Sequence, residues 1–393
     1  MTGDPRRGDR TRLTHTGRGG TRHHGVVNPP IYQASTVTFP DVATLKEAMR
    51  TPDRFVTYGR RGTPTTFALQ DAIAALEGAG STLLVPSGLA AITVALLASV
   101  GPGDHLLVVD SAYAPARTFC DTTLKQLGVE VTYYDPHIGA GIDGLFRRNT
   151  RAVFLESPGS ITFEVQDVPA IAAVARARGA VSLIDNTWAT PLFFKPLLLG
   201  VDVSIQAVTK YIGGHADLMM GAMTASEPML SKLRHWVYSM GLCAGPQDMY
   251  LALRGIRTLS ARLAQHQQTA MQLATWLSQR PEVERVLYPP LPSDPGHRLW
   301  KSDFTGGSGL FGVLLKPFAD NAVAAFIDGL ELFGIGYSWG GFESLIVPQD
   351  PRQIRTAVPW QASGPLVRIH AGLEDPDDLR ADLEAGLGRL KKS

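Results

Sequence analysis

The chain has 393 residues, of which 44% are hydrophobic and 19% are charged, so it is long enough to bury a large core. Its formal net charge is +1, and this balance argues against a protein that binds nucleic acid or an anionic membrane by electrostatic attraction. The two cysteines, Cys120 and Cys243, have no paired spacing, so we expect two small core residues rather than a disulfide or a metal site. The N-terminus lacks an apolar signal region, which favours the cytoplasm, and the apolar stretch at 90–100 is too short to span a bilayer.

Residues 1–62 are rich in Gly, Pro, Arg and Thr, and this composition predicts an extended N-terminal arm that buries little by itself. From residue 81 onward, short apolar runs alternate with helical stretches. The runs cover residues 82–85, 104–110, 129–134, 151–157, 180–185, 202–207 and 221–226. This alternation predicts an α/β domain over residues 63–266, with a mostly parallel sheet covered by helices on both faces. Ligands of such sheets bind beyond the carboxyl ends of the strands.

A long helical pattern follows Pro246 and meets no proline before Pro281, so we expect a single long helix that bridges two domains. Strand patterns and helical runs are mixed beyond it. The strand patterns lie at 283–289, 309–316 and 366–373, and the helical runs lie at 322–330 and 375–390. The mixture predicts a smaller α+β domain over residues 267–393.

The segment LIDNTWATPLF, residues 183–193, ends an apolar strand pattern on Asp185. A carboxylate in this position commonly caps a turn. A carboxylate held beyond the end of a buried parallel strand can instead pair with a cationic group of a ligand. Asp185 alone does not decide between these two interpretations.

The segment SIQAVTKYIGGHAD, residues 204–217, places Lys210 directly after an apolar run, where a lysine is disfavoured unless it is partnered or exposed. A lysine at a site of low polarity has a lowered pKa, which makes its amine a nucleophile toward an aldehyde. Thr209 could bond an anion beside it. His215 has no second histidine at ligand spacing, so no metal site is predicted.

The segment VPSGLAAITVALL, residues 85–97, is typical of a strand, a Ser87–Gly88 turn and a helix. The free N–H groups and the dipole at the start of that helix suit a phosphate. A plain helix cap is the alternative, because serine is a good N-cap residue. An amine nucleophile, an upstream carboxylate and an anion-binding helix start are together the parts that pyridoxal phosphate (PLP) requires.

Several longer stretches carry a resemblance to a known family, and they occur in that family's order. They are VNPPIYQASTVTF, YGRRGTPTTFALQ, SGLAA, DNTWATPLFFKPLLLGVD, SIQAVTKYIGGHAD, RGIRTL, YSWGGFESL and RIHAGLED. The chain resembles the Cys/Met-metabolism family of PLP-dependent enzymes, fold type I, over nearly its whole length. The resemblance implies PLP as the cofactor and an amino acid as the substrate.

The resemblance also implies roles for the residues around the cofactor. The lysine of the TKY segment, here Lys210, holds the cofactor covalently, and the aspartate of DNT, here Asp185, binds the pyridine nitrogen. The backbone amides of Gly88 and Leu89 and the hydroxyl of Thr209 are implied to bind the phosphate.

Further implied roles belong to residues outside these segments. Tyr58 and Arg60, in YGRRG, resemble the pair that reaches the phosphate of a neighbouring subunit, whereas Arg60 alone would be read as a solvated loop charge. Tyr113 resembles the tyrosine that stacks on the cofactor ring and helps in catalysis. The resemblance therefore implies an oligomer, expected to be a homotetramer, with active sites shared between two subunits.

Residues near the C-terminus are implied to bind the substrate. Arg368, in LVRIHAGL, resembles the partner of the substrate carboxylate, helped by Ser338, although an internal acidic residue would satisfy a buried arginine equally well. Tyr337 and Trp339 flank that serine and are expected to contact substrate, with ordinary core aromatics as the alternative.

Two local features favour a carbon–sulfur β-lyase within the family. Many γ-type relatives carry SLGG where this chain has a tryptophan, in Ser338–Gly341, and carry Ser or Cys where this chain has Gln206–Ala207. We therefore expect Lys210 to act as general base in a β-elimination that releases pyruvate, ammonia and a thiol from cystathionine or a related cysteine S-conjugate.

Other interpretations stay open at this point. Some relatives carry an acidic residue near the position of Thr118, and its absence here leaves the contact to the far end of a long substrate undetermined. A γ-lyase acting on cystathionine or methionine, an O-acylhomoserine sulfhydrylase and a non-catalytic PLP-binding regulator are the alternatives, because the fold alone decides no function.

Overall fold

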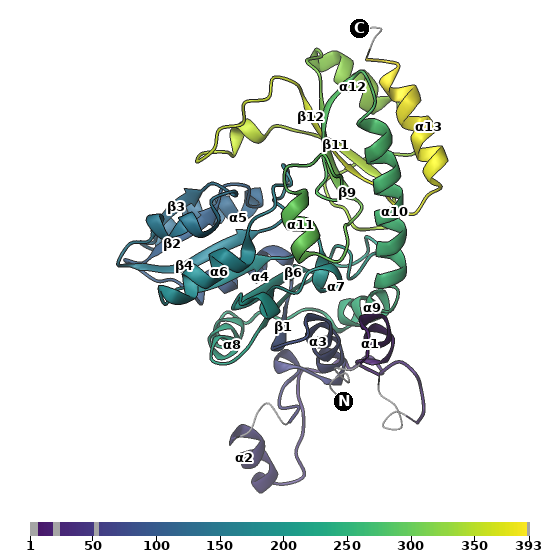
Figure 1. Ribbon diagram of the computed structural model, residues 1–393. Helices are drawn as coiled ribbons and strands as arrows, with labels where there is room; N and C mark the ends of the chain where they lie inside the picture. Colours follow the sequence, from purple (N-terminus) through teal and green to yellow (C-terminus); the bar gives the residue numbers. More distant parts are fainter. Residues whose placement is uncertain (1–6, 19–23, 51–54, 391–393) are drawn as a thin grey trace.

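The computed structural model describes residues 7–18, 24–50 and 55–390. Its larger sheet has seven strands in the order β1-β7-β6-β5-β4-β2-β3 (Figure 1). Their bounds are β1 Ser81–Val85, β2 His105–Val109, β3 Glu130–Tyr134, β4 Thr150–Glu156, β5 Val181–Asp185, β6 Val203–Ala207 and β7 Gly221–Ala225. Neighbours from β3 to β6 pair in parallel, and β7 runs antiparallel to both of its neighbours. The predicted α/β fold with a mostly parallel sheet is confirmed.

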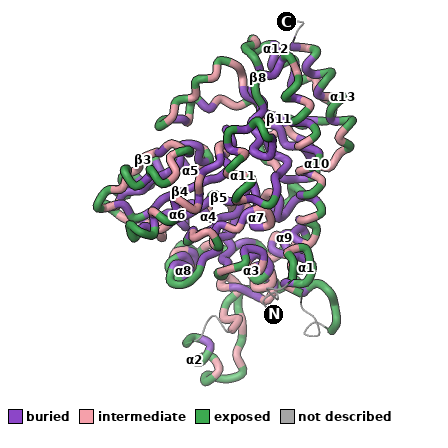
Figure 2. The backbone as a smooth tube through the Cα atoms, in the orientation of Figure 1, coloured by how far each residue is buried: buried purple, intermediate pink, exposed green. Residues whose placement is uncertain are grey.

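The strands form because their residues are apolar on both faces, which suits a sheet that is covered by helices on both sides. All five residues of β2 are buried, as are all five of β7. Figure 2 shows the buried backbone running through the centre of this domain. The α-helices described up to residue 239 are α1 Asp9–His15, α2 Val42–Arg50, α3 Pro64–Glu77, α4 Gly88–Leu97, α5 Ala114–Phe119, α6 Val168–Ala177, α7 Thr190–Phe193 and α8 Met229–Ser239.

A second sheet of five strands lies in the C-terminal part, in the order β10-β11-β12-β9-β8. Its bounds are β8 Val283–Leu287, β9 Leu310–Leu315, β10 Gly334–Ile335, β11 Leu345–Gln349 and β12 Leu366–His370. The helices in this stretch of the chain are α11 His297–Asp303, α12 Asp320–Asp328 and α13 Pro376–Leu387. Strands β8, β9 and β12 match the predicted patterns. The sequence did not reveal β10 and β11, because β10 has two residues and β11 contains Pro348.

The predicted single long helix is wrong, because two helices, α9 Pro246–Arg257 and α10 Leu259–Leu277, meet at Thr258. Thr258 has φ −103° and ψ 4°, and its hydroxyl donates to the carbonyl of Gly255 at 3.2 Å. A threonine side chain that bonds nearby backbone competes with the helical pattern. α10 extends from the large domain to the second sheet (Figure 1), and the expected domain boundary at 266/267 lies inside it.

The N-terminal arm is not wholly extended. α1 packs on α3, and Leu13 of α1 is buried in one apolar cluster with Leu69 and Ile73 of α3. α2 projects away from the body of the molecule, and Figure 2 shows the segment that leads into it, residues 31–41, as mostly exposed.

Both cysteines are free thiols, but only Cys120 is buried, and burial raises its pKa to about 12. The expectation that Cys243 is a core residue is wrong, because it is exposed on the segment between α8 and α9. Across the described residues, no helix is long and apolar enough to cross a membrane, and no group of three His, Cys, Asp or Glu side chains is arranged to hold a metal.

Candidate active site

Asp185 is the last residue of β5, at the carboxyl edge of the large sheet. Its Oδ1 accepts a hydrogen bond from the backbone N–H of Thr187 at 2.9 Å. Burial raises the pKa of Asp185, although hydrogen bonds from Thr187 and the charge of Lys210 oppose that shift. A buried carboxylate of this kind gains from an additional cationic or N–H partner.

Thr187 connects this carboxylate to the neighbouring strand. Its Oγ1 accepts the backbone N–H of Ala207, the last residue of β6, at 2.9 Å. The chain turns immediately after Ala207, and the N–H of Lys210 donates to the Ala207 carbonyl at 3.0 Å. The two segments that the sequence singled out therefore lie side by side at one edge of the sheet.

The third segment reaches the same edge. Ser87 caps α4, and its Oγ accepts the N–H of Ala90 at 3.0 Å. A Cβ built on Gly88 would lie 2.6 Å from the Cβ of Ala207, so only glycine lets the start of α4 pack this closely against β6. The N–H groups of Gly88 and Leu89 open the helix, where backbone donors have no partner inside it. The arrangement suits an anion beside Lys210.

The side chain of Lys210 faces the C-terminal domain. Its Nζ donates to Ser338 Oγ at 2.7 Å and lies 5.2 Å from the centre of the Trp339 ring. Burial lowers the pKa of Lys210 to about 8, helped by the positive charge of Arg368 and opposed by Asp185. An amine with this pKa is partly neutral near pH 8 and can act as a nucleophile or as a base.

Arg368, on β12, is directed toward the same place. Burial lowers its pKa to about 10, while the nearby hydroxyls of Tyr113 and Tyr337 oppose the shift. Arg368 Nη2 donates to the Tyr337 carbonyl at 3.4 Å, and no ion pair joins it to an acidic side chain in the described part of the chain. The guanidinium can therefore receive a carboxylate from a ligand. Tyr337 itself is 82% exposed, which contradicts the alternative that it is a core aromatic.

Tyr113 is the N-cap residue of α5 and lies beyond the end of β2. Burial raises the pKa of its phenol, and the negative charges of Asp185 and Glu156 add to the shift. Its backbone N–H donates to Glu156 Oε2 at 2.7 Å. The structure thus places Tyr113 near Asp185, as a ring-stacking residue requires.

Sequence reasoning missed Glu156. It ends β4 and stands directly opposite Asp185 in the parallel register of β4 and β5. Burial raises its pKa well above the usual value, and the neighbouring Asp185 contributes to that shift. The signal was the same as for Asp185, a carboxylate that ends an apolar run.

Thr209 lies beside Lys210, but its hydroxyl is already engaged. Its Oγ1 donates to the Met220 carbonyl at 3.2 Å and accepts the Met220 N–H at 3.0 Å. Because a hydroxyl has one proton, Thr209 has to rotate before it can donate to a phosphate.

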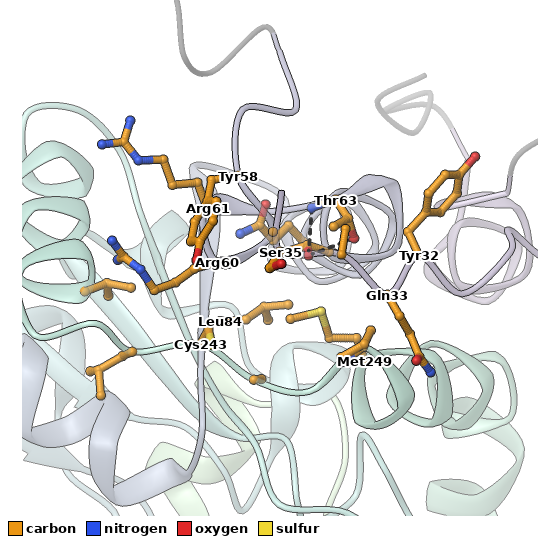
Figure 3. Close-up of a pocket in the computed structure, with 18 of the residues that line it drawn as sticks. Tyr32, Gln33, Ser35, Tyr58, Arg60, Arg61, Thr63, Leu84, Cys243 and Met249 are labelled. Atoms are coloured by element: carbon orange, nitrogen blue, oxygen red, sulfur yellow. Dashed lines mark hydrogen bonds between the residues drawn. The ribbon is translucent and has the colours of Figure 1, made fainter. Parts of the chain in front are cut away.

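Tyr58 and Arg60 do not lie with these residues. They line a separate cavity of about 520 Å³, which Figure 3 shows with Tyr58, Arg60 and Arg61 grouped on one side and Tyr32 and Gln33 on the other. Lys210 and Asp185 do not line this cavity. Arg60 Nη1 donates to the Tyr238 carbonyl at 2.9 Å, and Tyr58 is 45% exposed.

The remaining residues form one site that fits PLP by its chemistry. An amine of lowered pKa, a buried carboxylate without an ion-pair partner in the described chain and an open helix N-terminus converge at the edge of β5 and β6. These groups match an aldehyde, a pyridinium nitrogen and a phosphate, respectively.

The comparisons with known proteins agree with this chemistry. The sequence matches the family described as Cys/Met metabolism PLP-dependent enzyme over residues 10–388. It is 52% identical over 383 residues to a putative cystathionine beta-lyase of Rhizobium johnstonii, covering 96% of both chains. It is 45% identical over 387 residues to cystathionine beta-lyase MetC of Escherichia coli, covering 97% of this chain and 98% of that one.

A solved structure, MetB from Corynebacterium glutamicum, superposes on this chain with a TM-score of 0.90 at 31% identity, covering 99% of this chain and 100% of that one. The likeness in fold therefore extends over both sheets. From the match over nearly its whole length, the chain belongs to the Cys/Met metabolism family of PLP-dependent enzymes.

Proposed function

We propose that the protein is a carbon–sulfur β-lyase that cleaves L-cystathionine to homocysteine, pyruvate and ammonia. The observation that carries the proposal is the convergence on Lys210, where an amine with a pKa of about 8 lies between Asp185 on one side and Ser338 and Trp339 on the other. The relatives named cystathionine beta-lyase support the substrate.

The proposed holding residues follow from the geometry. Lys210 Nζ would hold the aldehyde carbon, Asp185 the ring nitrogen, and the amides of Gly88 and Leu89 the phosphate. Tyr113 would stack on the ring. When bound, PLP supplies an electron sink that stabilises negative charge on the substrate Cα.

The residues of the chain then carry the proton transfers. Arg368 binds the substrate carboxylate through its guanidinium and orients Cα toward Lys210. Lys210 Nζ, released by the substrate amine and neutral, takes the Cα proton. The Cβ–S bond breaks with its electrons on sulfur, and the Lys210 ammonium returns a proton to that sulfur. Water converts the remaining three-carbon fragment to pyruvate and ammonia.

Trp339 favours elimination at Cβ within this proposal. Its ring centre lies 5.2 Å from Lys210 Nζ, so the ring occupies space beside the base. It leaves less space for a substrate whose bond to sulfur lies one carbon further from Cα. This feature is the reason to prefer the β-lyase to a γ-lyase or a sulfhydrylase.

The test supplies cystathionine to the purified, cofactor-loaded protein. Equal amounts of pyruvate and free thiol are expected. α-Ketobutyrate with cysteine would replace the proposal by a γ-lyase. Turnover of acylated homoserine that requires sulfide, with no pyruvate from cystathionine, would replace it by a sulfhydrylase.

We further propose that the active enzyme is a homotetramer built from dimers, in which Tyr58 and Arg60 complete the phosphate site of a neighbour. Their place in a cavity apart from Lys210 supports this role. Sedimentation of the active protein tests it, and a monomer with full activity would contradict it.

The free thiols of Cys120 and Cys243 support a reducing cytoplasm as the working compartment.

A further inference from the structure

A short segment, Tyr337–Gly341, covers Lys210 from the C-terminal domain. Its Ser338 Oγ accepts a hydrogen bond from Lys210 Nζ at 2.7 Å, and the centre of its Trp339 ring lies 5.2 Å from the same nitrogen. The segment also presses on the Lys210 backbone, because a Cβ built on Gly340 would lie 2.8 Å from Tyr211 N and 3.0 Å from the Lys210 carbonyl carbon. Gly340 has φ +86°, which favours glycine at this contact.

The segment has no secondary structure between β10 and β11, so other contacts must fix its position. Two residues of β12 provide them. Arg368 donates to the Tyr337 carbonyl at 3.4 Å, and His370 Nε2 accepts the Gly340 N–H at 3.0 Å. Residues two apart on a strand point to the same face, so β12 holds the segment at both ends with Ser338 and Trp339 between.

The bond from His370 requires one form of the imidazole. Nε2 must carry a lone pair to accept the Gly340 N–H, and Nδ1 then carries the proton that it donates to the Glu343 carbonyl at 3.1 Å. His370 is 1% exposed, and burial lowers its pKa well below the usual value, helped by the charges of His266, Arg368 and Lys210. The ring therefore stays neutral, in the form that the two bonds need.

We propose that His370 is a positioning residue of the active site, whose Nε2 fixes Gly340 and thereby sets Ser338 and Trp339 against Lys210. This inference rests on the proposed function for its activity readout. His370 touches neither substrate nor cofactor in this proposal and acts only through the segment.

Two substitutions separate the two bonds of the imidazole. The amide of a glutamine reaches the place of Nε2 and can accept the Gly340 N–H, whereas the amide of an asparagine reaches only the place of Nδ1 and can keep the Glu343 bond. His370→Asn leaves a buried N–H of Gly340 without a partner, and we expect kcat to fall about ten- to hundredfold. His370→Gln is expected to keep kcat within about threefold of the parent.

A second readout does not depend on turnover. The visible absorbance of the cofactor-loaded protein titrates with pH, and the midpoint reports the surroundings of Lys210 Nζ. We expect His370→Asn to shift that midpoint because Ser338 moves away from Nζ, and His370→Gln to leave it near the parent value.

His105 supplies the matched control. It is fully buried and bonded at both ring nitrogens, to Thr150 at 2.8 Å and to Thr132 at 2.9 Å, but it lies at the opposite end of β2 from the site. His105→Asn and His105→Gln measure the cost of replacing a buried histidine. We expect them to lower Tm while the kcat and the absorbance midpoint stay unchanged.

The outcomes are distinguishable. If the parent protein forms no pyruvate, the proposed function fails, and the absorbance midpoints still decide on His370. If the two His370 variants share the same midpoint as the parent, or shift it equally, the inference fails. Should His370→Asn not fold, a displaced midpoint in His370→Gln would still overturn the inference, because that variant keeps the bond to Gly340.

Discussion

Two regions of the molecule bury several charged side chains, and they treat those charges differently. In the first, which we call the Asp110 cluster, Asp110 accepts from Arg117 at 3.1 Å and from Arg355 at 3.0 Å, and Arg355 also pairs with Glu164 at 2.6 Å. The four residues bring two positive and two negative charges together, and backbone N–H groups of Thr356 and Val358 complete the bonds to the aspartate.

In the second region, the candidate site, Lys210, Arg368, Asp185 and Glu156 lie near one another. No ion pair joins any two of them in the described residues. Burial favours the neutral form of each group. It lowers the pKa values of Lys210 and Arg368 and raises those of Asp185 and Glu156.

The pKa of Asp110 moves the other way. Burial alone would raise it, but hydrogen bonds from the backbone of Val358 and Thr356 and from Arg355 outweigh that effect and hold it at about 2. Fully bonded charges of this kind hold the segment after residue 350 onto the large domain. Charged groups that lack an ion-pair partner can pair with a charged ligand, and pKa values that burial shifts toward the neutral form are typical of functional sites.

The largest effect should come from Lys210→Ala. Loss of the residue that acts as nucleophile and base should reduce pyruvate formation by about 10³-fold or more, and borohydride should no longer attach the cofactor to the peptide that contains position 210. Lys125→Ala, on an exposed lysine, is the control. A label found on another lysine in the parent protein would overturn the assignment.

A substitution in the Asp110 cluster should lower the stability of the protein. Asp110→Asn leaves two buried arginines undercompensated and is expected to lower the free energy of unfolding by about 3–5 kcal/mol, measured by denaturant titration. The folded pKa of Asp110 is below the unfolded one, so its contribution is present above about pH 4 and is lost as the pH falls toward about 2. The variant should lack this part of the acid dependence.

The exposed pair of Asp143 and Arg178, with oxygen–nitrogen distances of 2.7 Å, is the control for that comparison. Asp143→Asn should change stability much less, because solvent screens an exposed ion pair. If both variants lost the same free energy of unfolding, the buried Asp110 cluster would contribute no more to stability than the exposed pair.

Asp185→Asn should lower kcat by about 10²-fold, because an amide cannot keep the ring nitrogen protonated and the electron sink weakens. Asp202→Asn serves as control, since Asp202 accepts two bonds from Ser182 at 2.8 Å at the opposite edge of the sheet. An unchanged kcat in Asp185→Asn would contradict the proposed role of Asp185 at the ring nitrogen.

The lowered pKa of Lys210 predicts a pH dependence for cofactor capture by the cofactor-free protein. The neutral amine is the nucleophile, so the rate of appearance of the visible absorbance should rise with pH and level off above about pH 8. A rate that continues to rise beyond pH 10 would indicate an ordinary lysine pKa (about 10.4).

The smallest effect is expected for Glu156→Gln. If the raised pKa keeps Glu156 protonated at neutral pH, the glutamine amide is uncharged like the acid that it replaces and still accepts the Tyr113 N–H. We therefore expect kcat to change by no more than about threefold. A large fall in kcat would show that Glu156 is ionised and contributes its charge.

Much of the fold could be predicted because it is encoded locally. The seven apolar runs became β1 to β7, and the strand–turn–helix pattern around Ser87 became the end of β1, the cap and α4. Lys210 and Asp185 stood out for the same reason, since a charged residue that directly follows an apolar run contrasts with its own neighbours.

The sequence by itself therefore determined the α/β class, the family and the central lysine–aspartate pair, because periodicity and contiguous motifs need no knowledge of distant residues. Only the tertiary structure decided that Glu156 stands beside Asp185, that the helix breaks at Thr258 and that His370 bonds Gly340. Each of these depends on packing or hydrogen bonds that a linear pattern does not record, and the partner of His370 is 30 residues away in the chain.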